Sequence, residues 1–405
     1  MRPTSSHIQR VYLTLTLFNT LAASLIWGIN TLFLLHAGLS NSQAFLANAF
    51  FTVGQVLFEV PTGIVADLKG RRLSYLLGTV TLALSTLWYL WAWYMKAPFV
   101  WWALSSMLLG LGFTFFSGAT EAWLVDALES ARFKGSVDSV FAKAQSVGGI
   151  AMLVGSIGGG IIAQLTNLGV PYILRSILLG VTFVIAFVFM KDWGFTPKKR
   201  VNLRHDFKQQ FVTGFELGWK NRQIRLLMLA GPVISAVGFY TFYALQPFLL
   251  GLFGDSKAYA IAGAAAAIVA GSQIVGGISI PFVQRIFPRR SDVLIASTLL
   301  SVALLLIIAF SHSFWLVIGL LCLWGFVSSV ATPVRQAYMN SLIPSRERAT
   351  VLSFDNMFGS AGGAVIQPVL GKVADIYSYS SSFLVGSLAQ LVALPFLWKA
   401  RQEEK

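Results

Sequence analysis

The sequence predicts an all-α membrane protein with twelve transmembrane helices in two pseudo-symmetric bundles of six. Three observations predict this class: 56% of the residues are hydrophobic and only 11% charged, long apolar stretches recur along the chain, and its two halves resemble each other. Soluble domains carry about 25% charged residues. Helices are expected because the hydrocarbon core offers no hydrogen-bond partner to an open strand edge.

Charged residues, prolines and loop residues divide the 405 residues into apolar spans. About 20 apolar residues cross the ~30 Å hydrocarbon core as a helix. The first run follows Arg2 and Arg10 and exceeds a signal peptide's length without a small-residue cleavage pattern, so we expect a retained helix. The predicted spans are 12–36, 43–66, 73–95, 98–126, 137–165, 171–190, 225–252, 257–283, 293–311, 313–341, 350–375 and 380–399.

The longest polar interval, which contains "TPKKRVNLRHDFKQQ", separates the spans six and six. It predicts an N-terminal bundle over 1–190, a cytoplasmic linker over 191–224 and a C-terminal bundle over 225–405. A short amphipathic helix along the membrane surface is compatible with this linker.

Lysine and arginine predict the orientation. Of the 30 basic residues, 24 lie in the two tails and the loops on the same side, whereas the opposite loops hold Lys96 and Lys257. Cytoplasmic loops are enriched in basic residues, so both termini are expected in the cytoplasm of a bacterial inner membrane or an equivalent plasma membrane. The net charge of +14 follows from this orientation, and nucleic-acid binding is not expected.

The halves repeat at an offset of 212 residues. Ala-Thr at 119–120 aligns with Ala-Thr at 331–332, and Gly159 with Gly371. Parallel six-helix repeats are typical of transporters whose substrate site lies between the halves near mid-membrane.

The loop after the second span contains the sequence GIVADLKGRR, whose pattern residues are Gly63, Ala66, Asp67, Gly70, Arg71 and Arg72. This pattern resembles the signature loop of the major facilitator superfamily of secondary transporters, and the likeness covers essentially the whole chain. The resemblance implies that Asp67 caps helix eleven near 350–355 and that Arg71 pairs with Asp126. It implies a latch that holds the halves together on the cytoplasmic side when the cavity opens outward.

Helix five carries GSIGGG, which resembles the Gly-Pro-x-x-Gly-Gly motif of the superfamily's exporters, with Ser156 in place of proline. Ser106 stands where proton-driven exporters carry an arginine. The glycines of the GSIGGG motif, Gly155, Gly159 and Gly160, indicate either a hinge or a close helix crossing.

Ionisable residues inside the membrane are costly and are therefore functional candidates. Glu121 lies five residues before Asp126, hence about 7.5 Å deeper and about 140° around the helix. Helices one, four, seven and ten line the cavity in the resembled family, and this resemblance implies that Glu121 faces the cavity. We expect Glu121 to pair there with Arg335 across the molecular axis. The alternative is a static ion pair within one half or a snorkelling arginine.

Glu59 lies about 12 Å into the membrane from Asp67. Glu59 and Glu121 are the candidates for proton coupling. The alternative for Glu59 is a neutral carboxyl bonded to backbone near Pro61, whose missing N–H leaves a carbonyl without its donor.

Lys143 and Asp355 occupy equivalent positions in the repeat and predict an inter-half gate, or else two solvated charges. For the aromatic residues among the candidates for the substrate cavity, named next, the alternative is a role in packing or lipid contact. The cavity candidates are Asn19, Trp27, Asn30, Glu121, Tyr240, Tyr243 and Arg335.

Enzymatic and ATP-driven chemistry lack support. The sequence has no GxxxxGK[ST] loop, its four histidines show no metal-ligand spacing, and Cys322 is the single cysteine. No cofactor, metal or catalytic residue is predicted.

The predicted function is proton-coupled efflux of a small, partly apolar solute by alternating access, in a drug/proton antiporter-like exporter branch by resemblance. One alternative is a proton-coupled importer of a nutrient or organic anion, in which Arg335 holds the substrate's carboxylate. Another is a membrane receptor or scaffold without flux. The expected partners are the substrate, protons and the lipid bilayer, and a monomer is favoured.

Overall fold

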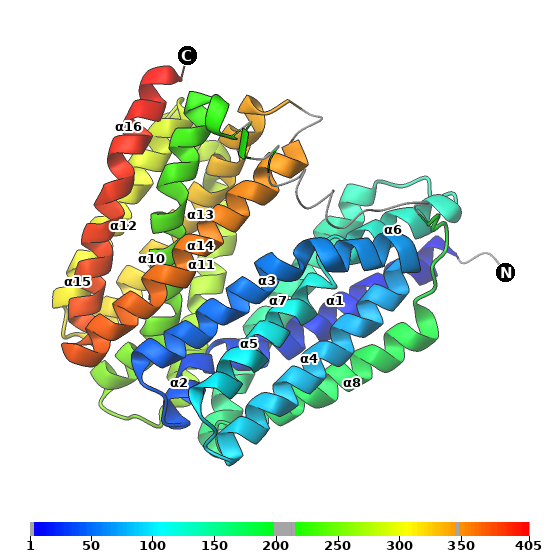
Figure 1. Cartoon of the computed structure of the whole chain (residues 1–405), viewed down its shortest axis with the longest axis horizontal. Coiled ribbons are helices and arrows are strands. Elements are labelled where there is room, and N and C mark those ends of the chain that lie inside the picture. Colours follow the sequence, from blue (N-terminus) through cyan, green and yellow to red (C-terminus); the bar gives the residue numbers. More distant parts are fainter. Residues whose placement is uncertain (1–3, 198–211, 213–214, 217, 345–347, 405) are drawn as a thin grey trace. The chain divides into compact units, whose positions relative to one another are not determined.

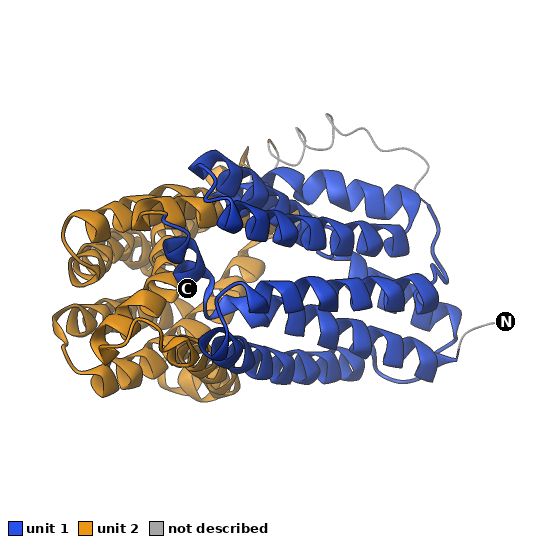
Figure 2. Cartoon of the chain, turned by 90° about the horizontal axis from the view of Figure 1, so that it is seen from below, with its two compact units in different colours: residues 1–38, 50–203 blue, residues 39–49, 204–405 orange. Residues whose placement is uncertain are grey.

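A computed structural model of the chain describes residues 4–197, 212, 215–216, 218–344 and 348–404. The described part is helical, with short turns and no strand. It forms two compact units (Figure 2): unit 1 contains 1–38 and 50–203, and unit 2 contains 39–49 and 204–405. The linker predicted at 191–224 lies largely outside the described residues, and the predicted domain boundaries stay a prediction.

Unit 1 is a bundle in which α1 packs against α7 and α8, and α4 packs against α5 and α8. α1 and α2 meet at a bend of 47°. The helices, labelled in Figure 1, are α1 (Ser5–Trp27), α2 (Asn30–His36), α3 (Asn41–Lys69), α4 (Arg71–Tyr94), α5 (Phe99–Thr114), α6 (Ala119–Ser130), α7 (Val137–Leu165) and α8 (Val170–Phe189).

Unit 2 repeats this packing, with α10 against α14 and α12 against α13 and α15. By the repeat, α10 and α14 correspond to α1 and α7. The helices are α10 (Arg222–Phe253), α11 (Tyr259–Ile286), α12 (Arg290–Phe310), α13 (Phe314–Leu342), α14 (Arg348–Ile376), α15 (Tyr379–Gln390), η1 (Leu391–Ala393) and α16 (Leu394–Glu403).

Ten helices in the described part are long and apolar enough to cross a membrane, and the bent pair α1 and α2 makes an eleventh. α14 has 29 residues and occupies the place of the eleventh predicted span. Its apolar sequence is interrupted by polar residues such as Asp355, Asn356 and Gln367. Together these helices fit the predicted all-α membrane fold of two bundles.

The span predicted over 98–126 corresponds to one candidate membrane span, Phe99–Ser130, which contains a short break. α5 ends at Thr114, and α6 begins at Ala119 after Gly118, which has the left-handed φ of +66°. This break lies near the middle of the 32-residue candidate span Phe99–Ser130. The Phe115 carbonyl accepts a hydrogen bond from Ser74 Oγ at 2.7 Å, so a side chain partners a carbonyl at the break.

Side-chain caps explain where several helices begin. Thr4, Ser136, Asn221, Ser313 and Ser378 each accept a backbone N–H from the first turn of α1, α7, α10, α13 and α15 respectively. Such caps satisfy N–H groups that have no partner within the helix. α3 begins in the same way, because Ser40 Oγ accepts the Gln43 N–H at 3.3 Å. The first residues of α3 belong to unit 2 and the remainder to unit 1.

Candidate functional site

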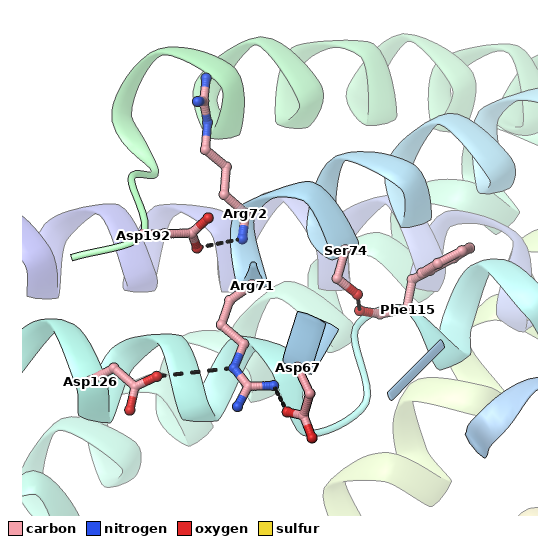
Figure 3. Close-up of polar contacts among 7 residues, drawn as sticks. All are labelled: Asp67, Arg71, Arg72, Ser74, Phe115, Asp126 and Asp192. Carbon is pink, nitrogen blue, oxygen red and sulfur yellow. Dashed lines mark hydrogen bonds and ion pairs between the residues drawn. The ribbon is translucent and has the colours of Figure 1, made fainter. Parts of the chain in front are cut away.

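The signature loop lies at the junction of α3 and α4 in unit 1 (Figure 3). Arg71 Nη1 donates to Asp67 Oδ1 at 2.6 Å, one helical turn earlier in the chain. Arg71 Nε lies 4.0 Å from Asp126 Oδ2 on α6. The three side chains are 18–33% exposed, so this short chain of alternating charge is only partly solvated. Its role as a latch stays a prediction.

The same junction contains an acid that sequence reasoning missed. Asp192 Oδ1 accepts the backbone N–H of Arg72 at 2.8 Å (Figure 3), at the start of α4. Gly70 immediately precedes α4 and has φ +108°, and a Cβ on Gly70 would overlap the Asp192 carboxylate. A negative charge at a helix N-terminus is favoured by the helix dipole. Asp192 therefore joins the segment after α8 to the signature loop.

In unit 2 an acid likewise caps a helix N-terminus, that of α12. Glu404 follows α16, and its two oxygens accept the backbone N–H groups of Arg290 and Ser291 at 3.0 Å each. Glu404 and Asp192 differ by 212 residues, the offset of the repeat, and that match was the signal available in the sequence. Gly63 of the signature pattern has nothing within 4 Å of an added Cβ, so no contact among the described residues accounts for that glycine.

Two carboxylates lie at the break between α5 and α6. Ser117 Oγ donates to Glu59 Oε1 of α3 at 2.7 Å, and Glu121 stands in the first turn of α6. Both glutamates are exposed. Unit 1 thus presents two acids beside an interrupted membrane-spanning helix, a kind of element that often forms substrate and ion sites in transporters.

Arg335 has a carboxylate partner other than the expected Glu121. Its Nη1 lies 2.6 Å from Asp355 Oδ2 and its Nη2 lies 2.7 Å from Asp355 Oδ1, while Nη2 also donates to the Leu227 carbonyl at 3.1 Å. The side chains are 22% and 5% exposed. These contacts of Arg335 join α13, α14 and α10 within unit 2. They match the alternative to the Glu121–Arg335 pair, a static ion pair within one half.

The same pair contains Asp355, one residue of the expected gate, and the gate with Lys143 stays a prediction. Both oxygens of Asp355 are bound by Arg335, whereas Lys143 is exposed on α7. Sequence position indicated that the two residues were equivalent, but the structure pairs Asp355 within its own unit, because α13 and α14 bring opposite charges together there.

Some cavity candidates are engaged inside the bundles. Asn30 Oδ1 accepts a hydrogen bond from Tyr172 Oη at 3.0 Å. Tyr240 is fully buried and hydrogen-bonded to Ser382. Asn19 and Tyr243 are half-buried, and Trp27 is exposed.

The glycine motif, which lies on α7, forms a close crossing with α1. An added Cβ on Gly159 would overlap the Leu25 carbonyl, and one on Gly155 would overlap Ser24 Oγ. Ser24 Oγ also donates to the Ala151 carbonyl at 3.1 Å. Of the two interpretations, this geometry supports close packing; Gly160 is likewise buried in α7.

Comparisons with known proteins agree with this fold. The family model described as "Major Facilitator Superfamily" matches residues 12–280 and 273–405. A Bacillus subtilis (strain 168) protein, described as the uncharacterized MFS-type transporter YxaM, is 22% identical over 396 residues, covering 95% of this chain and 94% of that protein.

Two solved structures have the same fold. The nucleoside transporter NupG is 13% identical with a TM-score of 0.76, and the match covers 98% of this chain and 99% of that one. A POT family transporter in complex with a thioalcohol-conjugated peptide is 14% identical with a TM-score of 0.72, over 98% and 96% of the chains. The chain therefore belongs to the Major Facilitator Superfamily and is a multi-pass membrane transporter.

Proposed function

We propose that this transporter exports a small, partly apolar solute in exchange for protons, as a member of an exporter branch of the superfamily. The observation that carries the proposal is the interrupted span in unit 1, where Glu59 and Glu121 flank the break between α5 and α6. Secondary transporters build substrate and ion sites from such discontinuous helices. Acids inside the membrane are costly and are therefore candidates for a role in the transport cycle.

The chemistry of the break suits exchange of a proton for a solute. When Glu59 is ionised, its Oε1 accepts the Ser117 hydroxyl proton at 2.7 Å, and Glu121 gains from the positive end of the α6 dipole. Protonation removes the negative charge and weakens both interactions. We assign Glu59 and Glu121 as the groups that bind the proton, so that a bound proton and a bound solute exclude each other.

The ion pair of unit 2 favours export over uptake of an organic anion. An importer that holds a carboxylate through Arg335 has to displace Asp355, which occupies both terminal nitrogens at 2.6 and 2.7 Å. Losing one partner of a buried pair costs about 3–5 kcal/mol. We therefore assign Arg335 a structural role within unit 2 and place the proton chemistry in unit 1.

The substrate is to be found by experiment, because the solved neighbours share only 13–14% identity. A thermal-shift screen of the detergent-purified protein identifies ligands, since a ligand that binds the folded state raises its apparent stability. The panel includes apolar amines. It also includes nucleosides and peptides, because the structural neighbours are a nucleoside transporter and a POT family transporter bound to a conjugated peptide. Substrate counterflow in proteoliposomes then tests for flux; binding without flux indicates a receptor or scaffold.

Proton release on ligand binding separates export from import. A pH indicator in weakly buffered detergent measures proton release. The unmodified protein (the parent) is expected to release protons when the ligand is added. Glu59→Gln or Glu121→Gln reduces this release, whereas Glu129→Gln, the matched exposed acid in the last turn of α6, leaves it unchanged. Proton uptake by the parent supports the importer. Unchanged release in both test variants removes the acids of the break from the mechanism.

A further inference from the structure

The N-terminus of α3 is capped by an acid that lies 334 residues away in the chain. Asp375, at the end of α14, accepts the backbone N–H of Asn41 on Oδ1 at 2.7 Å and that of Ser42 on Oδ2 at 2.9 Å. Both N–H groups belong to the first turn of α3 and have no partner within that helix. Tyr379 adds a hydrogen bond from its hydroxyl to Asn41 Oδ1. We call this set of contacts the Asp375 clasp.

Packing supports the clasp one turn further along α3. Phe45 is fully buried in a hydrophobic cluster formed otherwise by residues of unit 2, with its ring centroid 4.6 Å from that of Tyr240. Gly371 lies against the same turn: a Cβ added there would be 3.0 Å from both the Asn41 carbonyl oxygen and Ser42 Cα, and 2.7 Å from Phe45. Only a residue without a side chain lets α14 approach this closely.

The clasp has a mechanical consequence because α3 is shared. Residues 39–49 cluster with unit 2, whereas α3 from Phe50 onward belongs to unit 1. A motion that carries the whole of α3 with unit 1 breaks the two hydrogen bonds of Asp375 and withdraws Phe45 from its cluster. By the distribution of basic residues, this end is the predicted extracytoplasmic side.

We propose that Asp375 is a positioning residue for transport: its clasp holds the start of α3 against α14 while the extracytoplasmic side is closed, and it opens each time that side opens. The inference rests on transport by relative motion of the units and not on proton coupling, so it survives if the proton chemistry assigned above fails.

Hydrogen–deuterium exchange tests the contact itself. In nanodiscs, Asp375→Asn is expected to raise the exchange rate of peptides over residues 39–49 at least tenfold, because the asparagine offers one neutral acceptor in place of two charged ones. Asp375→Glu, which keeps the carboxylate, restores slow exchange. The control is Asp255→Asn, an exposed acid that accepts the Lys257 N–H within its own loop, and it leaves exchange at 39–49 unchanged.

Distance measurements test the opening. Spin labels at Ser40→Cys and Tyr377→Cys, both exposed positions, in a Cys322→Ser background report the separation of the two segments. Asp375→Asn is expected to raise the long-distance population at least threefold. Gly371→Leu, which inserts a side chain between α14 and α3, is expected to do the same, and Gly319→Leu, with nothing within 4 Å, is its control.

Two outcomes overturn the inference. Unchanged exchange in Asp375→Asn shows that the clasp contributes nothing to the start of α3. Faster exchange with an unchanged distance distribution, in both Asp375→Asn and Gly371→Leu, reduces Asp375 to a local helix cap. Monodisperse elution of every variant ensures that the comparison is made between folded proteins.

Discussion

Asp355→Asn is expected to destabilise the C-terminal helices by about 3–5 kcal/mol, the cost of leaving a buried charge without its partner. The native carboxylate lies 2.6 and 2.7 Å from the two terminal nitrogens of Arg335 and is 5% exposed. The asparagine oxygen replaces one of these contacts without its charge. The guanidinium then keeps only the Leu227 carbonyl, at 3.1 Å, as a full-strength acceptor.

The assay is equilibrium unfolding in mixed micelles of dodecyl maltoside and SDS, followed by far-UV circular dichroism. A double-mutant cycle with Arg335→Met is expected to give a coupling energy of about 1–3 kcal/mol, because removing both charges leaves no uncompensated charge. The matched control is Asp292→Asn, which breaks the more exposed pair with Arg401 and is expected to cost less than about 1 kcal/mol. Equal costs for Asp355→Asn and Asp292→Asn would refute the assignment of a buried structural pair.

Three further predictions concern unit 1. Arg71→Ala and Asp67→Asn are each expected to impair transport in proteoliposomes while membrane insertion stays normal; normal transport in both reduces the loop to a topological anchor. Asp192→Ala is expected to lower the unfolding free energy by about 0.5–2 kcal/mol through loss of the α4 cap, and an unchanged value in the same micelle assay contradicts the capping role. Gly159→Leu is expected to destabilise the crossing of α7 and α1 by more than the 1–3 kcal/mol typical of overpacking, because the added atoms meet backbone. Its neighbour Gly158→Leu, where nothing lies within 4 Å, is the control, and equal effects of the two exclude a close crossing.

Much of the fold could be predicted because hydropathy is a sum over neighbouring residues. A run of about 20 apolar residues spans the membrane as a helix whatever its partners are. Composition alone therefore placed the predicted spans 171–190 and 225–252, which correspond to α8 and α10. Composition did not predict the break after Thr114, since Phe115 and Phe116 are as apolar as any helical residue. Ser74 and Tyr75 of α4 hold that segment, through the Phe115 carbonyl and the Phe116 ring.

The candidate site was predicted as a set of residues but not as a set of contacts. Membrane depth singled out Arg335, Glu121 and Asp355 as costly charges. Which acid binds Arg335 depends on how α13 and α14 pack, and the repeat pattern does not contain that information. Asp375 was missed for the same reason: its partners are backbone N–H groups, which every residue but proline carries.

By itself, the sequence determined the class of the protein, the approximate helix boundaries and the family, because apolar length and a short glycine-spaced loop are local properties. The tertiary structure alone decided the partners: Asp355 for Arg335, Ser117 for Glu59, and the start of α3 for Asp375. Charges and hydrogen bonds act over a few ångströms, so their partners are known only when segments distant in the chain have been brought together.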